Sequence, residues 1–416
     1  NSCVYTRVAG VAEVAGGRSP NAALVEELLK TPEGSRFSTN VIEDALLDVP
    51  GLVQKYGYPF QAHDVVTADG YILQAHRIPF GRVNNIPGLQ RPVVFLMHGL
   101  LSSSADYLVL GPENALGYLL AEEGYDVWLG NARGNYYSRR HISLDPDDTD
   151  FWRFSWEEIG HFDLAAYVDY ILAITGQSRL HYIGHSQGGT SFLVLNSLRP
   201  QYNDRFISFQ GLAPAAYFDN NENSAFALLA PYEKIIETVA FQLGIAELLP
   251  NGPFLTWVGT YICGPESVYQ SLCINAINAN GNFDYFNATM VPVFLGHAPA
   301  GASIRQVAHY GQTIRRNAFA RFYHDPITNL RLYGRITPPE FDMSLITAPA
   351  YLHYGKADSE ADWRDIINLG ARLGNTVGVY GAERESFNHY DFIWGGRVKE
   401  ELYYTLFRLL REAEMV

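Results

Sequence analysis

Residues 180–190, with the sequence LHYIGHSQGGT, decide the fold because they place a serine at a sharp turn between a strand and a helix. The apolar run 180–183 has the pattern of a buried strand, and residues 190–198 have that of a helix. Between them Gly184, Ser186 and Gly188 form a Gly-x-Ser-x-Gly motif, whose glycines allow close backbone approach at the turn. The competing interpretation, a serine in an ordinary glycine-rich turn, is disfavoured by this context. The motif therefore predicts an exposed, nucleophilic Ser186.

The segments around this turn alternate between two patterns. Strand-like runs occur at residues 71–73, 93–97, 125–129, 180–183 and 350–354. Helix-like stretches occur at residues 113–123, 162–175 and 399–412. Strands that alternate with helices form βαβ units, so we expect an α/β fold with a mostly parallel sheet.

The alternation is interrupted in the third quarter of the chain. Residues 215–340 hold asparagine-rich turns and aromatic clusters, and we expect them to form an inserted, α-rich cap. The α/β core would then consist of residues 41–214 and 341–416. Residues 1–40 are interpreted as an N-terminal extension with one helix at 21–30.

The overall composition limits the classes of partner. Of the 416 residues 47% are hydrophobic, which is enough for a large core. The net charge of −14 argues against a nucleic-acid partner, because phosphate binding needs clustered lysine and arginine. No apolar run reaches the roughly 18 residues of a membrane span, so we expect no transmembrane segment. Because the sequence starts at Asn1, we interpret it as having lost a signal peptide, which predicts a secreted or lysosomal protein.

A nucleophilic serine needs a base, and chain position selects one histidine for this role. Five histidines follow Ser186. His353 lies inside the strand-like run 350–354, where a structural role in the core is expected. Three others fall in the expected cap: His297, His309 and His324. His389, in the loop before the C-terminal helix, is therefore the predicted base.

The acid that orients this histidine should follow a late strand and precede the histidine in the chain. Asp358 comes directly after the run 350–354 and is our prediction. Glu360 and Asp362 are close alternatives. The predicted triad is Ser186, Asp358 and His389.

Two backbone N–H groups should stabilise the oxyanion that forms during attack. One belongs to Gln187, the residue after the nucleophile. The other is expected in the turn that follows the run 93–97, and Leu100 is the donor we favour there. A simple strand-ending turn at His98 and Gly99 is the alternative.

Motifs for other chemistries are missing from the sequence, and the cysteines leave their pairing open. There is no HExxH, phosphate-binding loop or CxxC pair, so we expect no metal or nucleotide cofactor. Cys263 and Cys273 could form a disulfide or remain two thiols, and Cys3 has no evident partner. Asn287 begins an Asn-Ala-Thr sequon, a glycosylation site in a secreted protein.

Several blocks together resemble the acid lipase family of animals, which includes gastric and lysosomal acid lipases. The similarity covers about residue 40 to the C-terminus. Its blocks are HGLLSS (98–103), GNARGNYYSRRH (130–141), residues 151–156, LHYIGHSQGGT (180–190), HAPAGASIRQ (297–306) and FNHYDFIW (387–394). The resemblance implies an α/β-hydrolase core with a cap and lid, and a serine lipase or carboxylesterase that cleaves neutral lipid esters such as acylglycerols or sterol esters. It assigns the same triad and oxyanion residues.

The resemblance leaves the cap and the activity partly open. The lid candidate is residues 217–250, where Ile235, Ile236, Val239 and Leu243 share one helical face. That face could cover an acyl pocket or meet lipid, or it could pack inside the cap. Cys263 and Cys273 resemble the family's cap disulfide, and Gly189 stands where the family usually has threonine. The alternative function is a lipase-derived yolk, storage or lipid-carrier protein with little catalysis.

Overall fold

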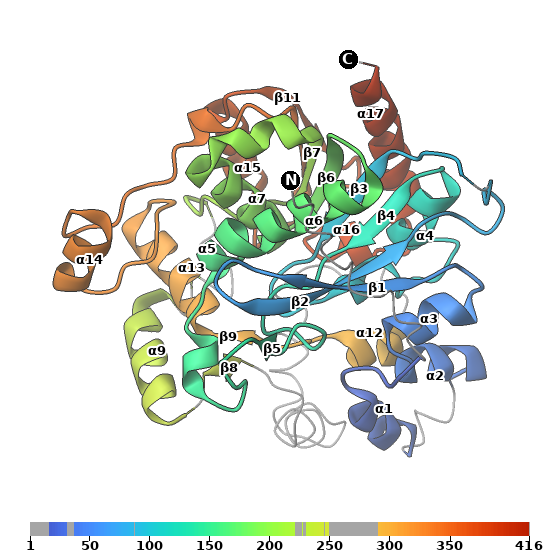
Figure 1. The fold of residues 1–416 in the computed structure, drawn as a ribbon, viewed down its shortest axis with the longest axis horizontal. Helices are drawn as coiled ribbons and strands as arrows, with labels where there is room; N and C mark the ends of the chain where they lie inside the picture. The colour runs from blue at the N-terminus through green and yellow to red at the C-terminus, as the bar shows by residue number, and fades with distance from the viewer. Residues whose placement is uncertain are drawn as a thin grey trace, which may run out of the picture.

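The computed structural model describes residues 16–30, 37–86, 88–220, 227, 230–244, 246–248 and 290–415. Within these ranges a nine-stranded sheet forms the centre of the molecule, in the order β1-β2-β4-β3-β6-β7-β10-β11, with β5 paired to β2 (Figure 1). The strands are β1 (Gln61–Val66), β2 (Tyr71–Ile78), β3 (Val93–Met97), β4 (Asp126–Leu129), β5 (Arg140–His141), β6 (Leu180–His185), β7 (Phe206–Leu212), β10 (Ala350–Tyr354) and β11 (Thr376–Gly381). From β4 to β11 all neighbouring strands are parallel, which confirms the predicted α/β class.

The sequence pattern missed four strands of this sheet: β1, β5, β7 and β11. In β7, Ser208 and Gln210 interrupt the apolar run, although both side chains are buried. Each side-chain oxygen of this pair hydrogen-bonds a histidine on a neighbouring strand. Ser208 Oγ bonds His181 Nδ1 on β6 at 2.8 Å, and Gln210 Oε1 bonds His353 Nε2 on β10 at 2.9 Å. His353 therefore has the core role expected from its position.

Helices cover both faces of the sheet (Figure 1). Those of the α/β core are α2 (Thr39–Leu46), α3 (Val49–Lys55), α4 (Leu116–Glu122), α5 (Trp156–Glu158), α6 (Ala165–Thr175), α7 (Gln187–Leu198), α15 (Trp363–Arg372), α16 (Asp391–Trp394) and α17 (Tyr404–Glu414). The expected helices at 162–175 and 399–412 each begin with a π-helical turn, Ile159–Leu164 and Lys399–Tyr403, before α6 and α17. An ion pair between Arg411 and Glu123 holds α17 against the end of α4.

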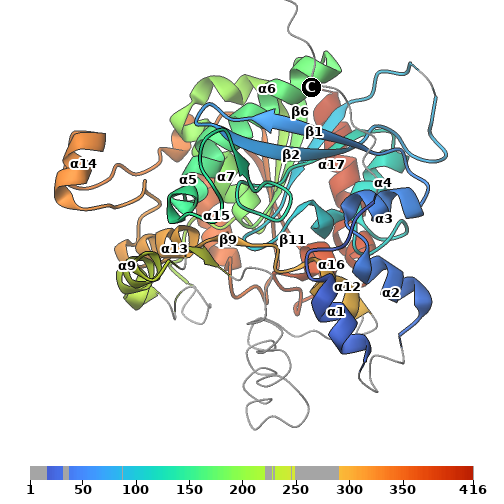
Figure 2. The same cartoon turned by 60° about the horizontal axis from the view of Figure 1, so that its bottom comes forward.

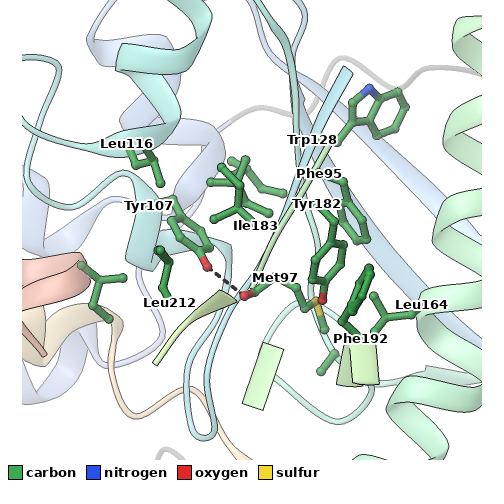
Figure 3. Close-up of a cluster of buried hydrophobic side chains, with 14 of the residues drawn as sticks. Phe95, Met97, Tyr107, Leu116, Trp128, Leu164, Tyr182, Ile183, Phe192 and Leu212 are labelled. Atoms are coloured by element: carbon green, nitrogen blue, oxygen red, sulfur yellow. Dashed lines mark hydrogen bonds between the residues drawn. The ribbon is translucent and has the colours of Figure 1, made fainter. Parts of the chain in front are cut away.

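The core beneath the sheet end fixes the loops that follow β3 and β6. Phe95, Tyr182 and Phe192 pack in contact, with ring centroids 5.5 and 5.0 Å apart (Figure 3). Tyr182 donates a hydrogen bond to the Gly188 carbonyl at 2.7 Å, and Tyr107 donates one to the Met97 carbonyl at 2.8 Å. Buried tyrosines thus tie both loops to the core.

Between residues 215 and 340 the described elements are mainly helical. They are α9 (Glu233–Gln242), α12 (Val291–His297), α13 (Ile304–Arg316), α14 (Pro326–Tyr333) and a two-stranded sheet of β8 (Glu247–Leu248) and β9 (Ala302–Ser303). Helix α1 (Ala22–Leu29), expected at 21–30, packs against α12 and α2. The division into extension, core and cap stays a prediction.

The described part of the lid candidate includes α9. Two ion pairs hold it on α13, Arg305–Glu237 and Arg315–Glu233, both at 2.6 Å. Val239 and Leu243 are 45% and 68% exposed, so these two side chains do not pack inside the cap. The side chains of Ile235 and Ile236, the other two members of this face, lie outside the described part of the structure. The three cysteines and the sequon also lie outside it, at Cys3, Cys263, Cys273 and Asn287.

One buried arginine organises the loop that carries the block at 130–141. Arg133 is 1% exposed and bonds Asp163 through Nε at 2.7 Å and Asp69 through Nη1 and Nη2 at 2.6 and 2.8 Å. Its guanidinium also lies over the Tyr71 ring. Because Asp163 is fully buried, it depends on this cation to remain charged inside the protein.

We therefore expect Arg133→Met to lower the free energy of unfolding by about 3–5 kcal/mol, since it leaves a buried carboxylate without a partner. The matched control is Arg408→Met, which removes an exposed pair with Glu412 and should cost about 0.5 kcal/mol or less. Urea unfolding followed by circular dichroism measures both. Equal effects of the two substitutions would contradict the role given to Arg133.

Candidate active site

Ser186 sits at the turn between β6 and α7 with an unusual backbone conformation. Its φ is 50° and its ψ is −115°, a region that residues other than glycine rarely adopt. The backbone is held there by its hydrogen bonds: Ser186 N–H donates to the Leu212 carbonyl, and the Ser186 carbonyl accepts from Gly189 N–H, both at 2.9 Å. Strain of this kind is characteristic of functional sites.

The glycines after Ser186 are required by close packing. A Cβ at Gly188 would lie 2.2 Å from the Met97 carbonyl oxygen, so no side chain fits at this position. A Cβ at Gly189 would lie 2.5 Å from Cβ of Pro214. In this chain the usual threonine of the family would therefore require Pro214 to move.

The structure brings His389 and Asp358 together. His389 Nδ1 lies 2.8 Å from Asp358 Oδ2, and both side chains are buried. The other oxygen, Asp358 Oδ1, accepts the backbone N–H groups of Glu360 and Ala361 at 2.9 and 2.8 Å. Asp362, by contrast, caps the N-terminus of α15. Of the three candidate carboxylates, Asp358 is the one in contact with the histidine.

His185, which precedes the nucleophile, joins the histidine loop to the turn. Its Nε2 donates to the His389 carbonyl at 2.9 Å, and the two imidazole rings lie 4.8 Å apart. Among the described residues the Ser186 hydroxyl forms no hydrogen bond. Ser186 is 9% exposed, so the predicted exposure was wrong, because the loop after β3 lies against this side chain. Catalytic hydrogen bonds are often long before substrate binds, so this geometry is compatible with attack by Ser186.

His98 orients the peptide that would supply one oxyanion donor. Its Nε2 accepts hydrogen bonds from Ala132 N–H at 3.1 Å and from the Asn135 side chain at 3.2 Å. The ring proton is therefore on Nδ1, which donates to the Gly99 carbonyl at 2.7 Å. Because C=O and N–H point in opposite directions across a trans peptide, the Leu100 N–H points away from His98.

This loop also lies against the nucleophile. A Cβ at Gly99 would be 3.3 Å from Ser186 Cβ. The second predicted donor, Gln187, is the first residue of α7, where a backbone N–H has no partner within the helix. Both predicted donors therefore belong to segments that meet at Ser186.

Contacts from the expected cap hold both donor segments. The Gln187 side chain donates from Nε2 to Gln306 Oε1 on α13 at 2.6 Å. Ala300 N–H donates to the Leu101 carbonyl at 2.7 Å. The sequence analysis missed the supporting residues His98, His185 and Gln306, although the blocks HGLLSS, LHYIGHSQGGT and HAPAGASIRQ contain them.

We expect His98→Ala to lower kcat by about 10–100-fold with little change in KM, because a misdirected N–H weakens stabilisation of the transition state more than substrate binding. His98→Asn should recover part of this loss, since an amide N–H can still donate to the Gly99 carbonyl. Steady-state kinetics on a soluble p-nitrophenyl ester test both variants. Unchanged kcat in His98→Ala would contradict the positioning role.

Among the residues that the structure describes, no group of three or more histidine, cysteine, aspartate or glutamate side chains could hold a metal ion. No helix in the same ranges is long and apolar enough to cross a membrane.

Two family models match the chain. A family model described as the partial α/β-hydrolase lipase region matches residues 49–111, and one described as the α/β hydrolase fold matches residues 92–230. The chain is 42% identical to Lipase 1 of Drosophila melanogaster, over 92% of this chain and 83% of that protein. It is 37% identical to the gastric triacylglycerol lipase of Rattus norvegicus, over 89% and 93% of the two chains.

Solved structures agree on the fold. One from Sulfolobus solfataricus, described as a candidate lipase, superposes with a TM-score of 0.56 at 14% identity, over 85% of this chain and 94% of that one. The relatives are named lipases, and the match covers most of their length. Because the fold is also that of α/β hydrolases, the protein is a carboxylic ester hydrolase. The chain belongs to the animal acid lipase family, together with the gastric triacylglycerol lipases.

Proposed function

We propose that the protein cleaves neutral lipid esters through an acyl-enzyme on Ser186. Ser186 Oγ attacks the ester carbonyl carbon while His389 Nε2 takes the hydroxyl proton. The N–H groups of Leu100 and Gln187 stabilise the oxyanion, and the leaving alcohol receives the proton from His389. Water, deprotonated by His389, then attacks the acyl carbon. The bond from this carbon to Ser186 Oγ breaks, Oγ takes the proton back from His389, and the fatty acid is released. The observation that carries this proposal is the 2.8 Å contact of His389 Nδ1 with Asp358 beside the strained turn at Ser186.

The substrate class is acylglycerols or sterol esters. The name of the gastric triacylglycerol lipases supports this choice. The exposed apolar side chains of Val239 on α9 and of Leu243 just after it also suit contact with acyl chains. The gastric relatives likewise support a secreted or lysosomal location for the activity.

A fluorophosphonate probe combined with an ester series tests the proposal. We expect one covalent adduct, located on Ser186 by peptide mass mapping, and hydrolysis of both p-nitrophenyl butyrate and emulsified triolein. No adduct and no turnover between about pH 4 and 8 would overturn the enzyme assignment and favour the storage or lipid-carrier alternative.

The acid limb of the pH profile follows from the protonation of His389. Burial lowers the pKa of His389, but the Asp358 carboxylate more than offsets this, and the pKa lies above the usual value of 6.5. Because the base must be neutral, we expect kcat/KM on a soluble ester to rise with pH through a pKa above 6.5. Initial rates between about pH 4 and 9 measure this limb. A limb centred near pH 5 would contradict the charge coupling to Asp358.

A further inference from the structure

Helix α14 stands clear of the body of the molecule, beyond α13 (Figures 1 and 2). Two antiparallel segments form the base from which it projects. Arg321 N–H donates to the Pro339 carbonyl at 3.0 Å, and Phe341 N–H donates to the Phe319 carbonyl at 2.9 Å. The projection is thus part of the hydrogen-bonded structure and not a loose loop.

The inner side of α14 is polar and fully buried at its centre. Asn329 is 0% exposed, and its amide bridges the two ends of the projection. Its Oδ1 accepts from His324 N–H at 3.1 Å, and its Nδ2 donates to the Ile336 carbonyl at 3.0 Å. The Tyr333 hydroxyl adds a hydrogen bond to the Phe322 carbonyl at 2.9 Å. These bonds fix which side of the helix faces outward.

The outward side is apolar. Four large side chains within ten residues are more than half exposed: Ile327 (81%), Leu330 (54%), Leu332 (52%) and Ile336 (61%). Ile327 lies on the helix face opposite Asn329, and Leu330 lies one turn further along, at the edge of that face. Single exposed apolar side chains scattered over a surface are normal, but a group of them on one projection marks a surface that meets a partner.

The same surface is positively charged in a protein whose net charge is −14. Arg331 follows Ile327 by one helical turn, and Arg335 precedes Ile336. Both arginines are exposed, and neither has a carboxylate partner among the described residues. Two acidic residues belong to the projection: Asp325, which accepts the N–H groups at the start of α14, and Glu340, which lies at its base, away from Arg331 and Arg335 in the sequence. Arginines that flank exposed apolar side chains match an anionic lipid surface.

A second copy of the chain is a poorer match for this surface. In a twofold contact the same patch meets itself, so Arg331 and Arg335 would face their own copies. The positive charges of the two copies would then lie close together, and no carboxylate that the structure describes pairs with either arginine.

We propose that α14 and the following turn to Ile336 form a docking surface for anionic lipid, inserting Ile327 and Leu330 between headgroups while Arg331 and Arg335 contact phosphate. The inference rests on the proposed function, because a lipid surface is where the ester substrate would be found.

Vesicle binding by the Ser186→Ala protein tests docking separately from hydrolysis. Co-sedimentation with vesicles of phosphatidylcholine and phosphatidylserine is measured for three proteins. They are Ser186→Ala alone, Ser186→Ala that also carries I327S/L330S, and Ser186→Ala that also carries R331Q/R335Q. The matched control is Ser186→Ala that also carries I142S/V377S. These substitutions remove two apolar side chains that lie outside the projection and are 69% and 50% exposed. Hydrolysis of p-nitrophenyl butyrate by the same surface variants with Ser186 intact reports on the active site.

We expect I327S/L330S to bind about tenfold or more weakly, and R331Q/R335Q to lose about fivefold per arginine at low salt, with no such loss on pure phosphatidylcholine. The control pair should bind normally, and all variants should hydrolyse the soluble ester at the unaltered rate. Unaltered vesicle binding by I327S/L330S, or no binding by any protein, would overturn the docking surface. A concentration-dependent dimer lost in I327S/L330S without an effect on vesicles would instead assign the surface to a second copy. If the unaltered protein hydrolyses no ester but the vesicle results hold, the proposed function fails and the docking surface stands.

Discussion

Ser186→Ala is expected to lower kcat for ester hydrolysis by about 10⁵–10⁶-fold while the protein stays folded. The substitution removes the one atom that forms the acyl bond, and the oxyanion donors cannot replace it. Alanine and serine have the same difficulty with a φ of 50°, so the turn itself should keep its shape and its stability. Steady-state rates and thermal unfolding of the variant provide the measurement.

A matched control lies one turn along α7. Ser191 is 1% exposed, and its buried hydroxyl has no hydrogen-bond partner among the described residues, so Ser191→Ala makes the same chemical change nearby, within α7. We expect this variant to retain activity and to react with the fluorophosphonate probe. If Ser186→Ala kept more than a few per cent of the activity, the nucleophile would have to be another residue.

Asp358→Asn is expected to lower kcat by about 10⁴-fold through a change of tautomer at His389. The two backbone N–H groups that Oδ1 accepts would hold the asparagine oxygen in the same place. The asparagine NH₂ group would then face His389 Nδ1, which must become an acceptor. The ring proton would move to Nε2, and that nitrogen could no longer take the proton of Ser186.

The control for this prediction is Asp362→Asn, four residues further along the chain. Asp362 caps α15 through its side-chain oxygen, which asparagine also supplies, so activity should be nearly unchanged. kcat and KM on a soluble ester distinguish the two variants. A loss smaller than tenfold in Asp358→Asn would mean that the carboxylate does not set the tautomer of His389.

Local patterns were sufficient for the features that depend on neighbours in sequence. The buried parallel strands are runs of apolar residues, and β3 and β10 begin and end where the sequence predicted them. Chain order and strand position were also enough to select Asp358 and His389, which the fold brings into contact. Their catalytic roles stay a prediction.

Features that depend on contacts between residues far apart in the chain could not be predicted from local sequence patterns. The buried polar residues of β7 are satisfied by His181 and His353 on other strands, so their sequence looks unlike a core strand. The contact of Gln187 with Gln306 joins residues far apart in the chain. The outward face of α14 was equally hidden, because its pattern of apolar residues does not tell which side is buried.

The order in which the site residues occur along the chain has a consequence for biosynthesis. Ser186 and both predicted oxyanion segments follow strands β3 and β6, whereas Asp358 and His389 follow β10 and β11. A ribosome-bound chain therefore presents Ser186 long before His389 has been synthesised. A serine without a base is a poor nucleophile, so under the proposed mechanism the nascent chain would not cleave esters until translation is nearly complete.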